Sequence, residues 1–299
     1  MRIDYLRYFD HLADVLNYTR AAEDLFIAQP TLSVAIKRME KELGFGLIRR
    51  IEGTSKIELT EAGVAFREHV QASLKSYDQG IRVAQEIEGQ LNSELRVGTI
   101  YAMQGNYWSE ALQAFVETQT VKPQMSFRQA YSYMLAEAVR KGELDAAFAS
   151  RVEGYEDLNH CLVWSQSLVV AVNKSNPLAK RKQVSLSDLA GIEVLTYGPT
   201  SPTIQNMRKL SLPEGVRLRA EYADEITMCS LISSNPSSAA LFCYSFLTAA
   251  FQDVVCLPIS GVPADFQKVY LISRNETHTK VVEEFLGFMG SYRFPRLVP

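Results

Sequence analysis

The residues best suited to chemistry in this chain are six basic side chains between positions 29 and 56. They are Lys37, Arg38, Lys41, Arg49, Arg50 and Lys56, and the same stretch holds only the three acidic residues Glu40, Glu42 and Glu52. Six minus three gives a local charge of +3, whereas the whole chain of 299 residues carries a net charge of −3. No global field therefore draws the molecule to nucleic acid, so any DNA contact must come from this local patch. An amphipathic helix with lysines is by itself usually a solvated face.

The sequence contains none of the common motifs that mark a catalytic site. There is no GxSxG elbow, no GxxxxGK[ST] phosphate loop and no GxGxxG fingerprint. The histidines are far apart and fall in no HExxH frame: His11, His69, His160 and His278. Glu143 and Asp145 stand where a helix turns into a strand, which favours a helix stop over acid–base chemistry. We therefore expect a protein that is not an enzyme.

The four cysteines also indicate no metal or disulfide framework. Cys161, Cys229, Cys243 and Cys256 form no CxxC pair and lie among apolar or small residues. This pattern predicts reduced core thiols in a cytosolic protein, with no metal site and no cofactor. The first residues, "MRIDYLRYFDHLADVL", are interrupted by charge every two or three positions, so we expect no signal peptide, no membrane partner and a cytoplasmic location.

A short helix beginning at a proline must position the basic patch. Pro30 suits a first helical turn, where its missing N–H is no loss, so a helix is predicted from about Gln29 to Gly44. Its inward stripe is Leu32, Ile36, Met39 and Leu43, spaced by 4, 3 and 4 residues. Its outward side chains are Thr31, Ser33, Val34, Lys37, Arg38 and Lys41. Such a helix fits the major groove, which is roughly 12 Å wide.

Two neighbouring elements would support this helix. Tyr18 or Thr19 can start a preceding short helix, Arg20 to Leu25, with Thr19 as a candidate N-cap and Phe26 closing the helix. The segment "FIAQ" supplies the turn between the two helices without the glycine often found there. After Gly44, "GLIRRIEGTSKIELT" reads as two extended segments joined by a turn at residues 53–55. The resulting β-hairpin, or wing, would offer Arg49, Arg50 and Lys56 as a second set of phosphate contacts.

One long helix follows, from Thr60 to about Leu91. Its apolar or small positions follow a 4-3-4-3 rhythm that favours pairing with another helix: Val70, Leu74, Tyr77, Ile81 and Ala84. The alternative is a helix that lies on its own domain, because Gly80 and Gly89 weaken the seam.

Beyond "GQLNSE", a plausible hinge, strands and helices alternate. "LRVGTI", "QMSFR" and "DAAFA" read as strands separated by helices over residues 107–116 and 132–141. Further strands include "SLVVAV", "EVLTY", "VRLRAEY", "AALFC" and "KVYLIS", followed by a last helix over residues 280–289. This alternation predicts parallel βαβ units and an α/β domain.

The order and spacing of these motifs resemble the LysR-type transcriptional regulators. "TRAAEDL", "AQPTLS", "IKRMEKELG" and "LTEAG" carry the resemblance in the N-terminal part, and "LRVGT", "GELDAAF" and "NPLA…VSLSDLAG" extend it along the chain. The family implies a multidomain protein, with an all-α winged helix-turn-helix domain at 1–60 and a linker or dimerisation helix at 61–91. A two-lobed α/β effector domain, similar to periplasmic binding proteins, would follow at 94–299. Lobe I is expected at 94–162 and 267–299, and lobe II at 163–266.

The resemblance also implies DNA contacts and partners. Thr19, Arg20, Gln29 and Pro30 would lie near the DNA backbone, Thr31, Ser33, Lys37 and Arg38 in or at the groove with Lys41 beside them, and Arg49, Arg50 and Lys56 in the wing. The expected partners are double-stranded promoter DNA, a second copy of the chain in a homodimer that often assembles into a tetramer, a small-molecule effector and RNA polymerase. Half-sites on the DNA would be about 34–36 Å apart, or multiples of that spacing.

The chain departs from the family pattern at three positions. Val34 and Ala35 stand where a polar side chain is common, and neither can donate a hydrogen bond from its side chain. Ala28 stands where serine is usual, which removes one possible hydrogen bond to a phosphate and is expected to weaken affinity. Val34 could instead pack on a thymine methyl group.

The effector cleft should lie at the carboxyl ends of the strands, where helix N-termini present free N–H groups. The residues so placed are Thr99, Tyr101, Ala102, Tyr131, Ser132, Thr200, Ser201, Thr203 and Thr227. Alternatively, the threonines and serines only cap helices. Because Tyr101, Tyr131 and Tyr133 are bulky, the cleft is either partly filled or suited to a ligand that stacks on aromatic rings.

Two other functions remain compatible with the sequence. One is an effector-independent DNA binder with a vestigial cleft. The other is a bilobal small-molecule-binding protein or enzyme whose N-terminal helices only dimerise. A salt titration discriminates between this second alternative and a regulator. Binding to promoter DNA that weakens steeply with salt indicates a regulator, and negligible binding indicates the bilobal protein.

Overall fold

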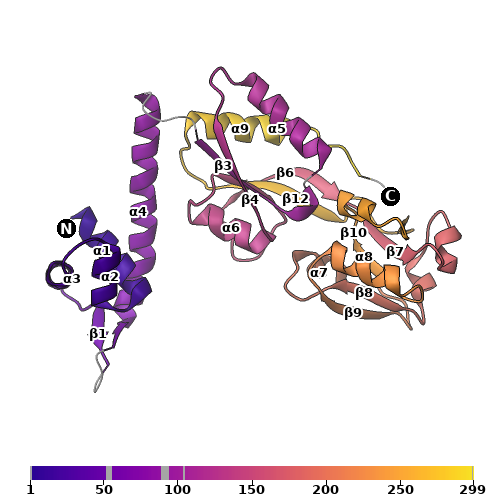
Figure 1. The fold of residues 1–299 in the computed structure, drawn as a ribbon, viewed down its shortest axis with the longest axis horizontal. Helices are drawn as coiled ribbons and strands as arrows, with labels where there is room; N and C mark the ends of the chain where they lie inside the picture. The colour runs from indigo at the N-terminus through magenta and orange to yellow at the C-terminus, as the bar shows by residue number, and fades with distance from the viewer. Residues whose placement is uncertain (1, 52–55, 89–93, 104, 298) are drawn as a thin grey trace. The chain divides into compact units, whose positions relative to one another are not determined.

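The computed structural model describes residues 2–51, 56–88, 94–103, 105–297 and 299, and divides into two compact units, Met1–Gln90 and Leu91–Pro299 (Figure 1). The expected wing turn at 53–55, the end of the linker helix at 89–91 and the hinge that follows it lie outside the described residues. Within the described part, no helix combines the length and the apolar character needed to cross a bilayer.

Three helices form the base of the N-terminal unit: α1 (Ile3–Val15), α2 (Tyr18–Asp24) and α3 (Gln29–Leu43). The predicted inward stripe of α3 is confirmed: Leu32, Ile36 and Met39 are fully buried in a core shared with α1 and α2, and the half-buried Leu43 packs against the same core. Pro30 occupies the first turn of α3, and Gly44 ends the helix with a φ of 80°. At such a positive φ a residue without a Cβ avoids the steric cost of the left-handed region.

The N-cap of α2 differs from the predicted one, although its first residue, Tyr18, is one of the two predicted starts. Asn17, not Thr19, caps the helix, because its side-chain oxygen accepts hydrogen bonds from the backbone N–H groups of Thr19 and Arg20 at 3.0 and 3.1 Å. The helix therefore begins at Tyr18, and Thr19 lies in its first turn. Asparagine and threonine are both good caps, so composition alone did not decide between the two positions.

Strands β1 (Ile48–Arg50) and β2 (Ile57–Leu59) form the predicted antiparallel hairpin. A carboxylate oxygen of Glu40 in α3 accepts the N–H groups of Leu47 and Ile48 at 2.7 and 3.1 Å, which fixes the start of the hairpin against α3. Gly63 makes a close approach possible on the other side, since a Cβ there would lie 2.2 Å from the carbonyl oxygen of Leu47.

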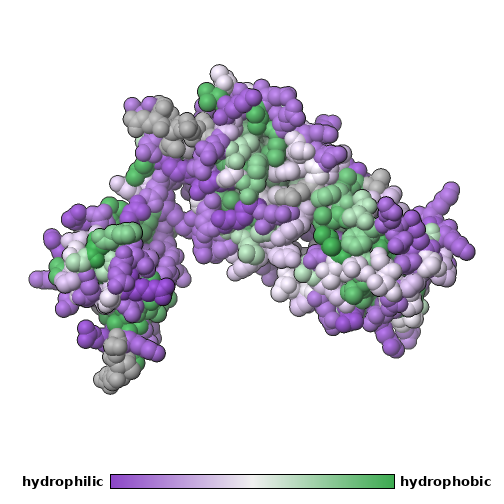
Figure 2. Space-filling model, in the orientation of Figure 1, coloured by the Kyte–Doolittle hydropathy of each residue, from purple (hydrophilic) through white to green (hydrophobic). Residues whose placement is uncertain are grey.

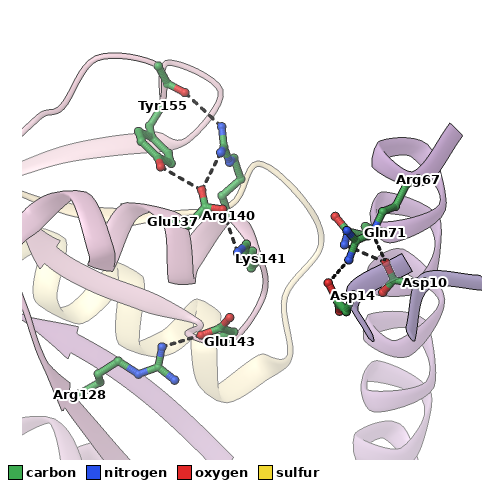
Figure 3. A network of polar contacts seen from close by, with 11 residues as sticks. Asp10, Asp14, Arg67, Gln71, Arg128, Glu137, Arg140, Lys141, Glu143 and Tyr155 are labelled. Atoms are coloured by element: carbon green, nitrogen blue, oxygen red, sulfur yellow. Dashed lines mark hydrogen bonds and ion pairs between the residues drawn. The ribbon is translucent and has the colours of Figure 1, made fainter. Parts of the chain in front are cut away.

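Helix α4 (Glu61–Ile87) is the longest described helix, and Figure 1 shows it extending well beyond α1 to α3. Its first half is tied to α1 by a polar cluster (Figure 3). Arg67 Nε lies 3.0 Å from Asp10 Oδ1, a second guanidinium nitrogen contacts Asp14, and Gln71 donates to Asp10 at 2.8 Å. These contacts fix the first half of α4, a helix that lies wholly within the N-terminal unit, against α1.

The second unit contains two five-stranded sheets (Figure 1). The first has the order β4-β3-β5-β12-β6, with bounds β3 (Glu94–Thr99), β4 (Gln124–Gln129), β5 (Ala146–Ala149), β6 (Asn159–Gln166) and β12 (Gln267–Ser273). Helices α5 (Asn106–Thr118) and α9 (Lys280–Ser291) pack on one face, and α6 (Ser132–Arg140) packs on the other. The 3-10 helix η1 (Tyr101–Met103) follows β3 directly.

The second sheet has the order β11-β7-β10-β8-β9 and a continuous apolar core. Its strands are β7 (Leu168–Asn173), β8 (Glu193–Tyr197), β9 (Arg217–Tyr222), β10 (Ala239–Cys243) and β11 (Val254–Pro258). The helices are α7 (Pro202–Met207) and α8 (Glu225–Ser234), with short 3-10 turns η2 (Pro177–Lys180), η3 (Leu186–Leu189) and η4 (Phe246–Ala250). Strands β6 and β11 were not predicted.

Both sheets are mixed rather than purely parallel. In the first sheet β3 is parallel to β4 and β5, but β12 is antiparallel to β5 because the chain enters it on the way back from the second sheet. The expected boundary at 162/163 falls inside β6, which pairs with β12 as far as Gln166. The chain passes to the second sheet at Ser167, four residues later than expected. It returns at Gln267, where β12 begins.

Candidate nucleic-acid interface and effector cleft

The outward face of α3 carries most of the side chains proposed to meet DNA. Thr31, Lys37, Arg38 and Lys41 are exposed, and Ser33 is half-buried. Val34 is 64% exposed, whereas Ala35 is buried, so only one of the two apolar departures can reach a ligand. Packing of the opposite face therefore leaves a polar, basic surface on α3, with one exposed valine within it.

The cations on this face are available to an anionic partner. Lys37 and Lys41 have no carboxylate within ion-pair distance among the described residues. Arg38 Nε lies 3.3 Å from Glu42 Oε1, one turn further along the helix. An exposed pair of this kind contributes little to stability, so a phosphate group could displace Glu42 at small cost.

The wing presents its basic residues on a short hairpin. Arg49 Nε lies 2.7 Å from Glu58 Oε1 on the facing strand, and Arg50 and Lys56 are exposed. At the base of the hairpin, burial and the nearby Glu40 carboxylate raise the pKa of Tyr18 to about 12, with Arg50 acting in the opposite direction. The Glu40 carboxylate already accepts the backbone N–H groups of Leu47 and Ile48. This acidic residue of α3 is therefore held within the fold.

The turn before α3 exposes an aromatic ring that the sequence suggested would close α2. Phe26 is 96% exposed and has a φ of 54°. It occupies the C′ position of a Schellman motif, in which its N–H bonds the Glu23 carbonyl and the Ile27 N–H bonds the Ala22 carbonyl, both at 3.0 Å. Thr19, Arg20, Gln29 and Pro30 are also exposed. Hydrophilic side chains otherwise dominate the visible face of this unit (Figure 2).

The residues predicted to form a dimer seam divide into two groups. Val70 and Leu74 are buried in the N-terminal unit's own core, so in this chain they serve the packing of α4 on its own domain. Tyr77, Ile81 and Ala84 are exposed. The alternative reading of the heptad pattern thus applies to the first half of the seam, where α4 lies against α1.

A cavity of about 530 Å³ lies in the C-terminal unit, within the size range of small-molecule sites. Seven of the nine proposed effector residues line it: Tyr101, Ala102, Tyr131, Ser132, Thr200, Ser201 and Thr203. Thr99 does not, because it is fully buried and its hydroxyl donates to the Ile100 carbonyl. Thr227 is exposed outside the lining; the two residues that begin this helix, Asp224 and Glu225, line the cavity instead.

Elements of both sheets contribute to this cavity, which we call the cleft. From the first sheet come η1, the start of α6 and the residues after β5. From the second come Tyr197 at the end of β8 and the starts of α7 and α8. The Ser132 hydroxyl accepts the Ser150 N–H at 3.1 Å, and the Ser201 hydroxyl accepts the Thr203 N–H at 3.3 Å. These two hydroxyls therefore support the backbone as well as facing the cleft.

The wall of the cleft contains a buried polar pair, Tyr197 and Glu225, that was not predicted from the sequence. The Tyr197 hydroxyl donates to Glu225 Oε1 and accepts the Cys243 N–H at 3.1 Å. Burial raises the pKa of the Glu225 carboxyl above its usual value, and the same burial raises the pKa of Tyr197. Only the "ADE" at 223–225, an acidic pair before an apolar helix, could have indicated this wall.

The two carboxylates of "GELD" are structural. Glu143 Oε2 lies 2.6 Å from Arg128 Nη1, and Asp145 forms a buried pair with Arg96 (Figure 3 shows the former). Within the described residues no group of three or more His, Cys, Asp and Glu side chains is placed to hold a metal ion. The polar groups that line the cleft come from tyrosine, serine, threonine, glutamine and carboxylate side chains and from Arg151.

Comparison with known proteins agrees with this two-part arrangement. Residues 3–64 match the bacterial regulatory helix-turn-helix proteins of the lysR family, and residues 88–292 match the LysR substrate binding domain. The chain belongs to the LysR family and is a DNA-binding transcriptional regulator with an effector-binding domain.

Individual relatives are similar over much of their length. The chain is 32% identical to the HTH-type transcriptional regulator BudR of Raoultella terrigena, over 67% of this chain and 68% of that protein. It is 28% identical to the regulator BenM of Acinetobacter baylyi, over 93% and 95%. The matched segments of the first relatives span 64–68% of their lengths. The fold is similar to full-length CbnR in its complex with target DNA, with a TM-score of 0.64 at 20% identity, covering 97% of this chain and 99% of that one.

Proposed function

We propose that this regulator binds promoter DNA through α3 and the wing of two protomers, and that a small molecule in the cleft alters that binding. The observation that carries the first part is the division of α3 into a fully buried apolar face and an exposed face with Lys37, Arg38 and Lys41. A helix of this kind can enter the major groove while its basic groups meet phosphates.

The protomers would associate through the exposed part of the linker helix. Tyr77, Ile81 and Ala84 provide an apolar strip on α4 that is not used by the domain's own core. Apolar residues at this spacing favour helix pairing. A homodimer, assembling further into a tetramer, is the proposed form. Replacing Ile81 with Glu is expected to lower the molecular mass measured by analytical ultracentrifugation; an unchanged mass contradicts a seam at this position.

The proposed setting is the cytoplasm, where promoter DNA and RNA polymerase are both accessible, and the proposed role does not include catalysis. RNA polymerase is proposed as a partner because a bound regulator acts on transcription through it. The effector role rests on the cleft, whose walls come from both sheets, so a ligand that binds one relative arrangement of the sheets more tightly would shift the population toward it.

Neutralising the α3 cations tests DNA binding directly. The double variant Lys37→Gln and Arg38→Gln should weaken binding to a fragment from upstream of its own gene by more than tenfold in fluorescence anisotropy. The slope of log affinity against log salt should fall by about 0.9 for each lost phosphate contact. The matched control is Lys180→Gln with Lys182→Gln, two exposed lysines of the basic stretch at 174–182. Equal affinity for both double variants would contradict the proposed interface.

A second experiment tests whether ligand binding in the cleft changes DNA binding. Metabolites that raise the melting temperature of the protein should also change its footprint on the same DNA fragment. A ligand that stabilises the protein without altering the footprint points to effector-independent DNA binding.

A further inference from the structure

The charges that line the cleft are predominantly acidic. Asp224 precedes α8 and Glu153 follows β5, whereas Arg151 is the one basic residue of the described lining. The Glu225 carboxyl beside Asp224 is buried and accepts the Tyr197 hydroxyl. Asp224 Oδ1 accepts the Thr227 N–H at 2.8 Å, so the chain's own carboxylate caps the first turn of α8. The partial positive charge of that helix end is therefore already neutralised, and it offers little to an anionic ligand.

Large apolar side chains are exposed within the same cavity. Tyr101, Tyr131 and Tyr133 are 40%, 47% and 60% exposed, and Met134 beside them is also exposed. The rings of Tyr101 and Tyr131 have centroids 5.6 Å apart, and the ring of Tyr133 meets Tyr155 edge-on at the same distance. Exposed aromatic rings gathered around one cavity present flat surfaces on which another ring can stack.

The ring of Tyr133 packs against a tyrosine, Tyr155, that the fold holds in place. The Tyr155 hydroxyl donates to Glu137 Oε2 at 2.9 Å, and Arg140 lies 2.6 Å from the same oxygen (Figure 3). Arg140 also stacks on the Tyr155 ring, with 4.3 Å between its guanidinium carbon and the ring centroid. Tyr133 thus packs against the Tyr155 ring, whose face contacts Arg140 and whose hydroxyl is bonded to Glu137.

The aromatic and acidic walls face the same space. Burial, Asp224, the Tyr101 hydroxyl and Glu225 together raise the pKa of Tyr131, so the two carboxylates act on a hydroxyl carried by the opposite wall. A positive group placed near Tyr131 would be attracted by Asp224 and by the faces of the tyrosine rings. A ligand carboxylate in the same place would meet the charge of Asp224.

We infer that the cleft binds a ligand made of an aromatic ring and a positively charged amine, with the ring among Tyr101, Tyr131 and Tyr133 and the amine near Asp224. This inference rests on the proposed effector role of the cleft, and it adds the chemical class of the effector. Arg151 does not change the class, because Glu153 lines the same cavity two residues further along the chain and opposes its charge.

Three probes with the same phenyl framework separate charge from shape: tyramine, 4-ethylphenol and 3-(4-hydroxyphenyl)propionate, which are positive, neutral and negative at pH 7. Isothermal titration calorimetry on the full-length protein without DNA should rank them in that order, with tyramine bound at least about tenfold more tightly than the propionate. Equal or tighter binding of the propionate overturns the inference, and so does the absence of binding by all three at millimolar concentration.

Asp224→Asn tests the position of the amine. Asparagine keeps the N-cap, so the fold of α8 should persist. Tyramine affinity should fall by about tenfold while that of 4-ethylphenol stays the same. The control is Glu284→Gln, an exposed carboxylate on α9 outside the cleft lining. Unchanged tyramine affinity in Asp224→Asn, with 4-ethylphenol still bound, overturns the assignment.

The inference about the ligand class and the proposed regulatory function can be contradicted independently of each other. Tyramine binding that leaves the DNA footprint unchanged supports the ligand class and counts against the effector role. Loss of DNA binding in the Lys37 and Arg38 double variant supports the DNA interface, whatever the three probes do in the cleft.

Discussion

Arg96 and Asp145 form a bidentate ion pair that joins the start of β3 to the start of β5. Arg96 Nη2 lies 2.8 Å from Asp145 Oδ1, Arg96 Nε lies 3.2 Å from Oδ2, and the backbone N–H of Arg96 donates to Oδ2 at 2.8 Å. The carboxylate is only 2% exposed. The second acid of "GELD" thus holds together two parallel strands of the first sheet.

Removing this carboxylate should be far more costly than removing its neighbour. Asp145→Ala leaves the Arg96 charge half-buried without its partner and is expected to destabilise the C-terminal unit by about 3–5 kcal/mol. Glu143→Ala breaks an exposed pair with Arg128 and should cost no more than about 1 kcal/mol. Urea unfolding followed by tryptophan fluorescence is suited to the comparison, because Trp108 and Trp164 both lie in the first sheet's core. Equal losses would contradict a structural role for the pair.

Phe26→Gly should stabilise the N-terminal unit. Phenylalanine in the left-handed region costs about 1–2 kcal/mol, and its ring, 96% exposed, contributes little burial in return. Glycine costs about 0.5–1 kcal/mol more through the unfolded chain, so a net gain between zero and about 1.5 kcal/mol is expected. Thermal unfolding followed by circular dichroism at 222 nm measures it. Phe26→Ala keeps the Cβ and is the control; if alanine stabilises as much as glycine, backbone strain is not the cause.

Val34 should prefer operator positions that carry a thymine methyl group. Replacing one contacted thymine with uracil is expected to weaken binding of the native protein by about 1 kcal/mol, the value of one buried methyl group. Val34→Ala should be insensitive to the same replacement. Competition binding of all four combinations gives the coupling energy between the side chain and the methyl group. A coupling of zero at every thymine of the half-site rules out the contact.

The buried Glu225 carboxyl should make stability fall as pH rises. Its pKa is raised above 4.5 in the folded protein, so the folded state binds more protons than the unfolded state once pH exceeds that value. The native protein should therefore lose stability relative to Glu225→Gln from pH 4.5 upward.

Asp188 provides a control of opposite sign. Hydrogen bonds from Ser185 and the nearby Arg181 lower its pKa from 3.8 to about 2. Its contribution is thus present above pH 3.8 and is lost as pH falls toward 2, so the difference between the native protein and Asp188→Asn should vanish there. Chemical denaturation at a series of pH values measures both. A pH-independent difference for Glu225→Gln would show that the group ionises normally.

One thiol of the four should react quickly. Cys161 is exposed, whereas Cys229 and Cys243 are buried and Cys256 is half-buried. Burial raises the pKa of the Cys256 thiol to about 11 and raises those of Cys229 and Cys243 further, which leaves little reactive thiolate. Titration with Ellman's reagent should show one fast equivalent, absent in Cys161→Ser, and four in denaturant. Two or more fast equivalents in the native protein would contradict this order.

The helix-turn-helix was largely predictable because its signals are local. Pro30 and Gly44 mark the ends of α3, and the spacing of Leu32, Ile36 and Met39 defines its buried face from neighbouring residues alone. The capping of α2 was not predicted correctly, since Asn17 and Thr19 are both good caps and only the backbone conformation distinguishes them.

The cleft was only partly predictable because its walls come from distant parts of the chain. Tyr131 and Ser132 could be placed from the helix that they begin. The meeting of Tyr197 with Glu225 and Cys243, across 28 and 46 residues, depends on strand order in the second sheet. Thr99 and Thr227 were misplaced for the same reason, since hydroxyl residues at strand and helix ends can face either the core or solvent.

The sequence by itself determined the type and order of the elements, the basic face of α3 and the family, because periodicity, caps and contiguous motifs are properties of neighbouring residues. Only the tertiary structure decided that Val70 and Leu74 serve the domain's own core, that the chain changes sheets at Ser167, and that Asp224 faces the tyrosines of the cleft. These outcomes depend on which elements pack together, and packing selects among partners that local sequence leaves equivalent.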